Sequence, residues 1–175
     1  PELQIFVDSP LSVNVTEVFK QHKECFDEET WQQFLNHKEN PFGFKQVRYI
    51  HDVEESKSLS KYHGPCIIIS ASGMCEFGRI LHHLKNNIED PRTIILLVGF
   101  MAKDTLGRKI LEKLPVVNIF GKPYRVQAQV EVIDAFSAHA DRTDLLNYIT
   151  RINGLKKVIL VHGEEEAQKG LKEAL

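Results

Sequence analysis

The sequence predicts an α/β fold: a mainly parallel sheet with helices on both faces, followed by a β-rich segment and then a second α/β segment. Short, nearly continuous apolar runs recur along the chain, which is typical of strands buried on both faces. Amphipathic helical patterns separate these runs, and such alternation indicates a doubly wound sheet. A change to β-rich composition near Pro115 places a domain boundary there.

Five apolar runs are the expected strands. They are LQIFVD (3–8), QVRYI (46–50), CIIIS (66–70), TIILLVGF (93–100) and KVILVHG (157–163). Between the first two runs, residues 11–39 predict two helices that end at the chain-breaking NPFG sequence.

Two further helices are predicted over residues 77–88 and 105–114. In each, apolar side chains three and four positions apart fall on one helical face, which would pack on the sheet. These side chains are Ile80, Leu81, Leu84 and Ile88 in the first helix, and Leu106, Ile110, Leu111 and Leu114 in the second.

The second part of the chain, residues 116–175, begins with β structure. A GKP turn at residues 121–123 precedes an alternation that predicts a strand, formed by Val126, Ala128, Val130 and Val132. Asp141 is expected to cap a helix, and an Asn-Gly turn, the last apolar run and a charged helix follow it. The side chains expected to point inward from the capped helix are Leu145, Leu146, Ile149 and Ile152.

Composition excludes several classes of protein. The chain has 22 basic and 24 acidic residues, so a net charge of -2 gives no overall attraction to nucleic acid or membrane. Three unpaired cysteines without C-x-x-C spacing argue for reduced thiols and a cytoplasmic protein. No apolar stretch is long enough to span a membrane, and no signal segment opens the chain. The first residues enter a strand at once, so we expect the chain to begin inside a larger protein.

Polar residues that directly follow apolar runs are candidate ligand-binding residues, because open α/β sheets bind ligands at the carboxyl ends of strands. Asp8 ends the first run and His162 ends the last. Considered alone, Asp8 is better explained as a helix cap or turn residue, whereas His162 is equally consistent with an ordinary histidine at a strand end.

The SASGM segment, residues 70–74, supplies Ser70, Ser72 and Gly73 between a strand and a helix. Backbone N–H groups in such a connection can hold an anion, and Arg79 could add positive charge to a phosphate site. The alternatives are a plain connection and a solvated arginine, since the glycine pattern matches no nucleotide-binding fingerprint. Of the adjacent His82 and His83, at most one is expected to be functional, because consecutive helical residues point in different directions.

His139 is the stronger catalytic candidate. It lies with Ser137 and Asp141 at the entry to a helix, where N–H groups favour an anion. A histidine there can protonate a leaving oxygen if a carboxylate orients it, and Asp8 could be that carboxylate. Metal ligation by His139 is a competing possibility that sequence spacing does not decide.

These segments resemble the β-CASP nucleases of the metallo-β-lactamase superfamily, and in particular the RNA-processing branch that includes the pre-mRNA 3′-end cleavage nuclease and its prokaryotic relatives. Asp8 in VDSPLS, His139 in FSAHAD and His162 in LVHGEEE match the family's late motifs A, B and C in order. The segments SASGM, GRILHHLKNNIEDPRTIILLVGF and TLGRKI are similar to the β-CASP insert. The resemblance covers nearly the whole chain.

The resemblance implies a Rossmann-like β-CASP domain over residues 1–115, with residues 116–175 completing a metallo-β-lactamase fold. It implies that His162 is a zinc ligand, that His139 assists leaving-group protonation and that Asp8 orients His139. The residues it places against substrate phosphates are Ser70, Ser72, Gly73, Arg79 and Ser137. A histidine in motif C goes with RNA substrates in this family. The implied activity is zinc-dependent hydrolysis of RNA, either internally or from the 5′ end.

The chain departs from the family pattern in one respect. It lacks the zinc-binding motif H-x-H-x-D-H, which precedes the β-CASP insert in the family. We therefore expect this chain to be a carboxyl-terminal piece whose partner is the amino-terminal lactamase half of the same protein. By itself it is predicted to bind zinc weakly or not at all and to be inactive on RNA. The alternative is a noncatalytic RNA-binding or assembly subunit, and the sequence leaves open whether the parent forms a homodimer.

Overall fold

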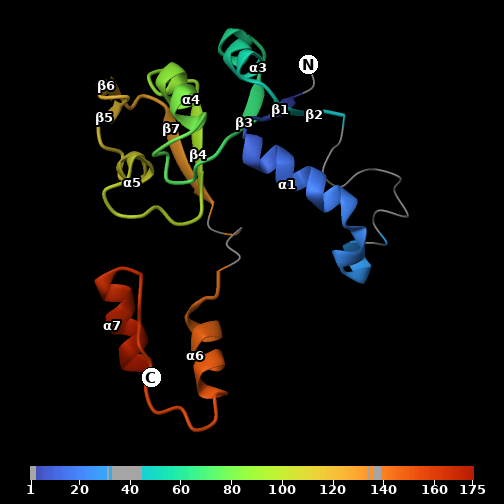
Figure 1. Ribbon diagram of the computed structural model, residues 1–175. Helices are drawn as coiled ribbons and strands as arrows, with labels where there is room; N and C mark the ends of the chain where they lie inside the picture. Colours follow the sequence, from blue (N-terminus) through green and yellow to red (C-terminus); the bar gives the residue numbers. More distant parts are fainter. Residues whose placement is uncertain (1–2, 31, 33–44, 134, 136–138) are drawn as a thin grey trace. The chain divides into compact units, whose positions relative to one another are not determined.

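The computed structural model describes residues 3–30, 32, 45–133, 135 and 139–175. The chain forms two compact units, unit 1 from Pro1 to Ala135 and unit 2 from Phe136 to Leu175. All strands of the described residues lie in unit 1, whereas unit 2 contains two helices (Figure 1). None of the helices in the described ranges is long and apolar enough to cross a membrane.

The first sheet of unit 1 is parallel, as predicted. Its central strand β1 (Gln4–Val7) pairs with β2 (Val47–Tyr49) on one side and with β3 (Cys66–Ile69) on the other. A small core of Phe6, Ile50 and Leu59 lies against this sheet. Because all three strands run the same way, the residues that follow them gather at one edge of the sheet.

The second sheet pairs β4 (Ile94–Val98) with β7 (Gln129–Ile133), again in parallel. In the chain segment that connects β4 to β7, β5 (Val116–Ile119) and β6 (Lys122–Arg125) form a separate antiparallel hairpin. The prediction of a GKP turn was wrong, because Lys122 and Pro123 belong to β6. Phe120 and Gly121 make the turn, with φ angles of 50° and 73° that match the twist of a tight hairpin.

Helix α1 (Pro10–Gln21) follows β1 and begins where the Ser9 side chain accepts a hydrogen bond from the backbone of Ser12. A short 3₁₀ turn η1 (Lys23–Cys25) comes next, and most of the second helix predicted before the NPFG sequence lies outside the described residues. Sequence periodicity did not predict α3 (Val53–Ser58) and the adjoining 3₁₀ turn η2 (Leu59–Lys61), which are short and carry a single buried residue.

Helices α4 (Ile80–Asn87) and α5 (Leu106–Leu111) pack on the β4–β7 sheet, as their apolar faces predicted (Figure 1). The side chains that form this larger core include Leu84, Ile88, Leu97, Leu106, Ile110, Val117 and Val130. The expected inward position of Leu114 was wrong. Helix α5 ends at Leu111, so Leu114 follows the helix and is 39% exposed.

In unit 2, Asp141 caps α6 (Arg142–Thr150) as predicted, and Asp144 completes a reciprocal capping box. The charged helix α7 (Glu165–Ala174) is also confirmed. The prediction of inward packing failed for Leu145 and Ile152, which are 38% and 43% exposed. Neither helix has a sheet to cover among the described residues of this unit.

The strand predicted over residues 157–163 is not formed in the structure. A strand is stabilised by backbone hydrogen bonds to a neighbour, and the described part of unit 2 contains no other strand with which this segment could pair. The α/β fold class with a parallel sheet is nevertheless confirmed for the chain. The domain boundary near Pro115 stays a prediction.

Candidate functional site

A buried carboxylate lies at the carboxyl end of β1. Asp8 has no exposed surface. Its Oδ2 accepts a hydrogen bond from Ser56 Oγ at 2.6 Å and lies 2.6 Å from His83 Nε2. Its Oδ1 accepts from Arg79 Nη1 at 2.5 Å. Both oxygens of Asp8 are therefore engaged within unit 1.

The partners of Asp8 come from two helices. Ser56 belongs to α3, and Arg79 and His83 lie one turn apart at the start of α4. Arg79 also donates to the carbonyl oxygen of Ile50, just after β2, while the Ser70 hydroxyl donates to the carbonyl of Asp8 at 2.9 Å. The cluster thus connects the carboxyl ends of β1, β2 and β3 with two helices.

The cluster keeps Asp8 in its charged form. Burial by itself would raise the pKa of the carboxyl group. Hydrogen bonds to Ser56, His83 and Arg79 outweigh this effect and lower the pKa below its ordinary value of 3.8. A negative charge at this depth is stable because a guanidinium and two further side chains satisfy it.

The predicted phosphate-binding residues of unit 1 gather at the same edge. Ser70, Ser72 and Gly73 lie in the segment after β3, and Arg79 directly precedes the following helix α4. The Ser72 hydroxyl oxygen is buried and has no hydrogen-bond partner within the described ranges, while nothing lies within 4 Å of the side on which Gly73 would carry a Cβ. The predicted Ser137 lies outside the described residues.

His139 and His162 both lie in unit 2, and both are exposed. His162 has a φ of 65°, in the left-handed region, and its carbonyl oxygen accepts a hydrogen bond from Gln168 Nε2 at 2.7 Å. The left-handed backbone there turns the chain into α7. A single site that joins these histidines to Asp8 stays a prediction.

A metal centre needs several ligands that converge on one point. No group of three or more His, Cys, Asp and Glu side chains in the described parts of the chain is arranged to hold a metal ion. The described residues alone therefore do not fit a complete zinc site, and His162 stays a predicted single ligand.

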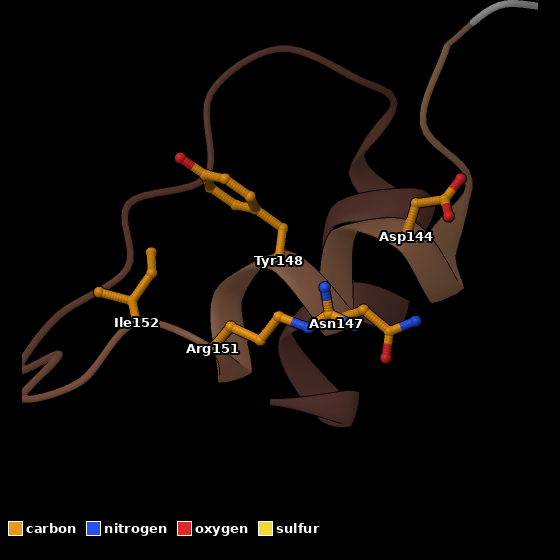
Figure 2. Close-up of a pocket in the computed structure, with 5 residues that line it drawn as sticks. All are labelled: Asp144, Asn147, Tyr148, Arg151 and Ile152. Atoms are coloured by element: carbon orange, nitrogen blue, oxygen red, sulfur yellow. The ribbon is translucent and has the colours of Figure 1, made fainter.

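Unit 2 has an open depression of about 550 Å³ on α6, lined by Asp144, Asn147, Tyr148, Arg151 and Ile152 (Figure 2). Asp144 and Tyr148 point in different directions in Figure 2, and neither predicted histidine belongs to the lining. Ligand sites combine enclosure with convergent polar groups. A depression along one helix lacks both, so we do not assign it a function.

Sequence reasoning missed Ser56 entirely and left His83 undecided. Ser56 lies 48 positions from Asp8, in a helix without a strong apolar pattern, and no local signal indicated it. His83 could have been chosen over His82 from its spacing, because it lies four residues after Arg79 and so shares a helical face with it. His82 instead contacts the ring of Phe120, with ring centres 4.8 Å apart.

These features define a parallel α/β protein with a polar cluster at the carboxyl edge of its sheet. Comparison with known sequences identifies the family. Residues 1–110 match the family described as Beta-Casp domain, and residues 123–175 match the family described as Zn-dependent metallo-hydrolase RNA specificity domain. The chain belongs to the β-CASP family of the metallo-β-lactamase superfamily, in its RNA-processing branch.

Three relatives illustrate the similarity. Ribonuclease TTHA0252 of Thermus thermophilus is 37% identical over 95% of this chain and 38% of its own length. Transcription termination factor FttA of Methanocaldococcus jannaschii is 31% identical over 86% of this chain and 25% of its own length. The RNase J-like protein of the same archaeon is 38% identical over 71% of this chain and 28% of its own length. The chain therefore spans well under half the length of these relatives.

Proposed function

We propose that this chain is part of a zinc-dependent ribonuclease that hydrolyses RNA phosphodiester bonds. The observation that carries the proposal is the match of one chain to both families, since the second is described as a Zn-dependent metallo-hydrolase RNA specificity domain. Similarity over 95% of the chain to a protein named ribonuclease supports it. The chain would supply the β-CASP domain, residues 1–115, and residues 116–175 of the lactamase domain.

The proposed contribution of unit 1 is substrate binding. Ser70, Ser72, Gly73 and Arg79 would contact phosphate groups of the RNA. Two observations support this: they lie at the carboxyl edge of a parallel sheet, and the buried Ser72 hydroxyl has no hydrogen-bond partner within the described ranges. Ser137 would add a further phosphate contact.

The proposed contribution of unit 2 is chemical. As water adds to phosphorus and the bond to the leaving oxygen breaks, His139 would give its proton to that oxygen, and the proton that the water releases would return His139 to its starting state through solvent. Asp8 would orient His139, since an ionised carboxylate has about four acceptor sites and the contacts to Ser56, Arg79 and His83 use three of them. His162 would bind zinc, and the remaining ligands of two zinc ions would come from the amino-terminal lactamase half.

A second candidate is a noncatalytic RNA-binding or assembly subunit. The observation that favours it is that several relatives are transcription termination factors by name, and this name does not itself refer to cleavage. In either case we propose a cytoplasmic protein, because the three cysteines are free thiols. Cleavage at internal positions and cleavage from the 5′ end are both compatible with the proposal, as is a homodimer.

The test compares the 175-residue chain with the longer protein that contains it, on end-labelled RNA with zinc or with EDTA. We expect cleavage by the longer protein only, and its loss in EDTA. His139→Ala should slow cleavage roughly 100-fold or more, whereas the exposed His63→Ala should not. Cleavage by the 175-residue chain would contradict its assignment as an inactive part. RNA binding without cleavage by the longer protein would favour the noncatalytic subunit.

A further inference from the structure

Two phenylalanine rings project from the loops that follow β3 and β4. Phe77, in the loop of residues 70–79, is 70% exposed, and Phe100, in the loop of residues 99–105, is 64% exposed. Nearby residues of the same loops, Cys75 and Met101, are each only 3% exposed. Each loop therefore has a buried anchor close to an exposed aromatic ring.

Hydrogen bonds join the loop that carries Phe77 to the segment that follows Phe100. The backbone N–H of Gly107 donates to the Met74 carbonyl at 2.9 Å, and the N–H of Ala102 donates to the Met74 sulfur at 3.2 Å. The Glu76 carboxylate, next to Phe77, accepts from the N–H of Leu106 at the start of α5. Figure 1 shows the two connections running beside each other between β3 and α4 and between β4 and α5.

The rings also lie in a suitable chemical setting. Phe77 stands between the predicted phosphate-binding residues Ser72 and Arg79 in the chain, and the Phe100 loop carries the exposed Lys103 beside Asp104. The loops follow parallel strands of two sheets, β3 of the first and β4 of the second, and the carboxyl ends of such strands are where ligands of open α/β folds bind. Exposed aromatic rings beside phosphate-binding groups are the combination that holds single-stranded nucleic acid.

We propose that Phe77 and Phe100 are base-stacking residues that select single-stranded RNA, an inference that rests on the proposed function. Bases in an RNA duplex are stacked on each other and inaccessible, whereas bases of a single strand can lie on an aromatic side chain. Since hydrogen bonds join the backbones of the two loops, little backbone entropy is lost when a base binds. Stacking is tolerant of base identity, so the rings would add affinity without strong sequence preference.

The test uses the full-length protein in EDTA, with fluorescence anisotropy of two labelled probes. One is a 12-nucleotide oligouridylate, and the other is a chain of the same length with abasic sites throughout. Phe77→Ala and Phe100→Ala should each weaken oligouridylate binding roughly 5- to 150-fold. Neither substitution should change binding of the abasic probe, because that probe has the phosphates but no base to stack.

Two further variants sharpen the result. Phe120→Ala removes a ring that is 53% exposed in the hairpin turn, and it should leave both affinities unchanged. Phe77→Trp should keep the affinity for oligouridylate, and its added fluorescence should be quenched when the probe binds.

Two outcomes would overturn the inference while leaving the proposed function intact. In the first, wild type binds and cleaves RNA but the two alanine variants bind oligouridylate equally well. In the second, both probes lose affinity to the same extent. If an alanine variant does not fold, Phe77→Trp decides, because tryptophan fluorescence that does not change when oligouridylate binds would also overturn the inference. If wild type has no affinity for RNA, the proposed function itself is wrong.

Discussion

Asp8 combines complete burial with a full charge, and its neighbours make this possible. Its partners Ser56, Arg79 and His83 satisfy both carboxylate oxygens, and Arg79 is itself only 15% exposed. Burying an ion pair costs desolvation energy for both groups, so removal of either partner leaves a charge without compensation. Asp8 therefore contributes to the stability of unit 1, by joining the end of β1 to α3 and α4, independently of any part in catalysis.

The substitution Asp8→Asn should lower the free energy of unfolding of unit 1 by about 3–5 kcal/mol, because it leaves the Arg79 charge nearly buried and unpaired. Urea denaturation followed by circular dichroism measures the change. Asp90→Asn is the matched control, since it breaks an ion pair with Arg92 that is largely exposed. A loss no larger than that of the control would show that the charge of Asp8 does not stabilise the fold.

The same cluster predicts how stability depends on pH. The pKa of Asp8 is lower in the folded protein than its ordinary value of 3.8. The folded state therefore holds the proton less tightly than the unfolded state, and the stabilisation is complete above that ordinary value. It is lost as the pH falls through the lower folded pKa. Urea midpoints measured from neutral pH into the acid range should decline more steeply for wild type than for Asp8→Asn, and parallel curves would contradict this.

At the scale of elements, α5 is positioned by its contact with the loop after β3. Thr105 caps the helix, and Gly107 in its first turn donates to the Met74 carbonyl. A Cβ at position 107 would lie 3.1 Å from that carbonyl oxygen and 2.6 Å from the Met101 sulfur. Because Gly107 has no side chain, the backbone of the loop after β3 can approach α5 closely enough for this hydrogen bond to form.

Gly107→Ala should destabilise α5 by about 1–3 kcal/mol, because crowding against backbone outweighs the better helix propensity of alanine. Gly170→Ala is the control within α7, where nothing lies within 4 Å of the added carbon, and it should stabilise its helix by about 0.5–1 kcal/mol. Hydrogen exchange of the amides in each helix distinguishes the two. Opposite signs are expected, and slower exchange of α5 in Gly107→Ala would refute the packing argument.

At the scale of the whole molecule, large apolar surfaces remain uncovered. Alternate residues of β3 and β4 expose their side chains, namely Ile67, Ile69, Ile94, Leu96 and Val98. Soluble proteins seldom leave contiguous apolar surface in water. The chain spans only 38% of the length of its ribonuclease relative, so these faces are where the remaining sequence of the proposed longer protein would pack.

The 175-residue chain by itself should therefore associate with itself as its concentration rises, which sedimentation velocity would detect. Replacing Ile69 and Leu96 together by glutamate should shift the chain toward monomer, because both are about half exposed on sheet faces. Leu175→Glu, at an equally exposed position at the end of the chain, should have no such effect. If the unsubstituted chain stays monomeric at every concentration tested, these sheet faces do not drive self-association.

Several parts of the structure could be predicted because their signals are local. The apolar runs of β1, β2, β3 and β4, the helical faces of α4 and α5 and the capping role of Asp141 depend on residues close together in sequence. The family resemblance rested on short motifs in order. Leu114, Leu145, Ile152 and the strand over residues 157–163 were predicted wrongly, because their environment depends on where a helix ends or on a neighbouring strand.

By itself, the sequence determined the α/β class, the position of most elements and the family, since apolar spacing and motifs act over a few residues. Only the tertiary structure decided that Asp8 is buried and that Ser56, Arg79 and His83 surround it, across separations of 48, 71 and 75 residues. It also decided that Phe77 and Phe100 stand exposed on loops tied by hydrogen bonds. The physical reason is that burial and hydrogen bonding between distant segments depend on how parallel strands bring their carboxyl ends together, which no local pattern records.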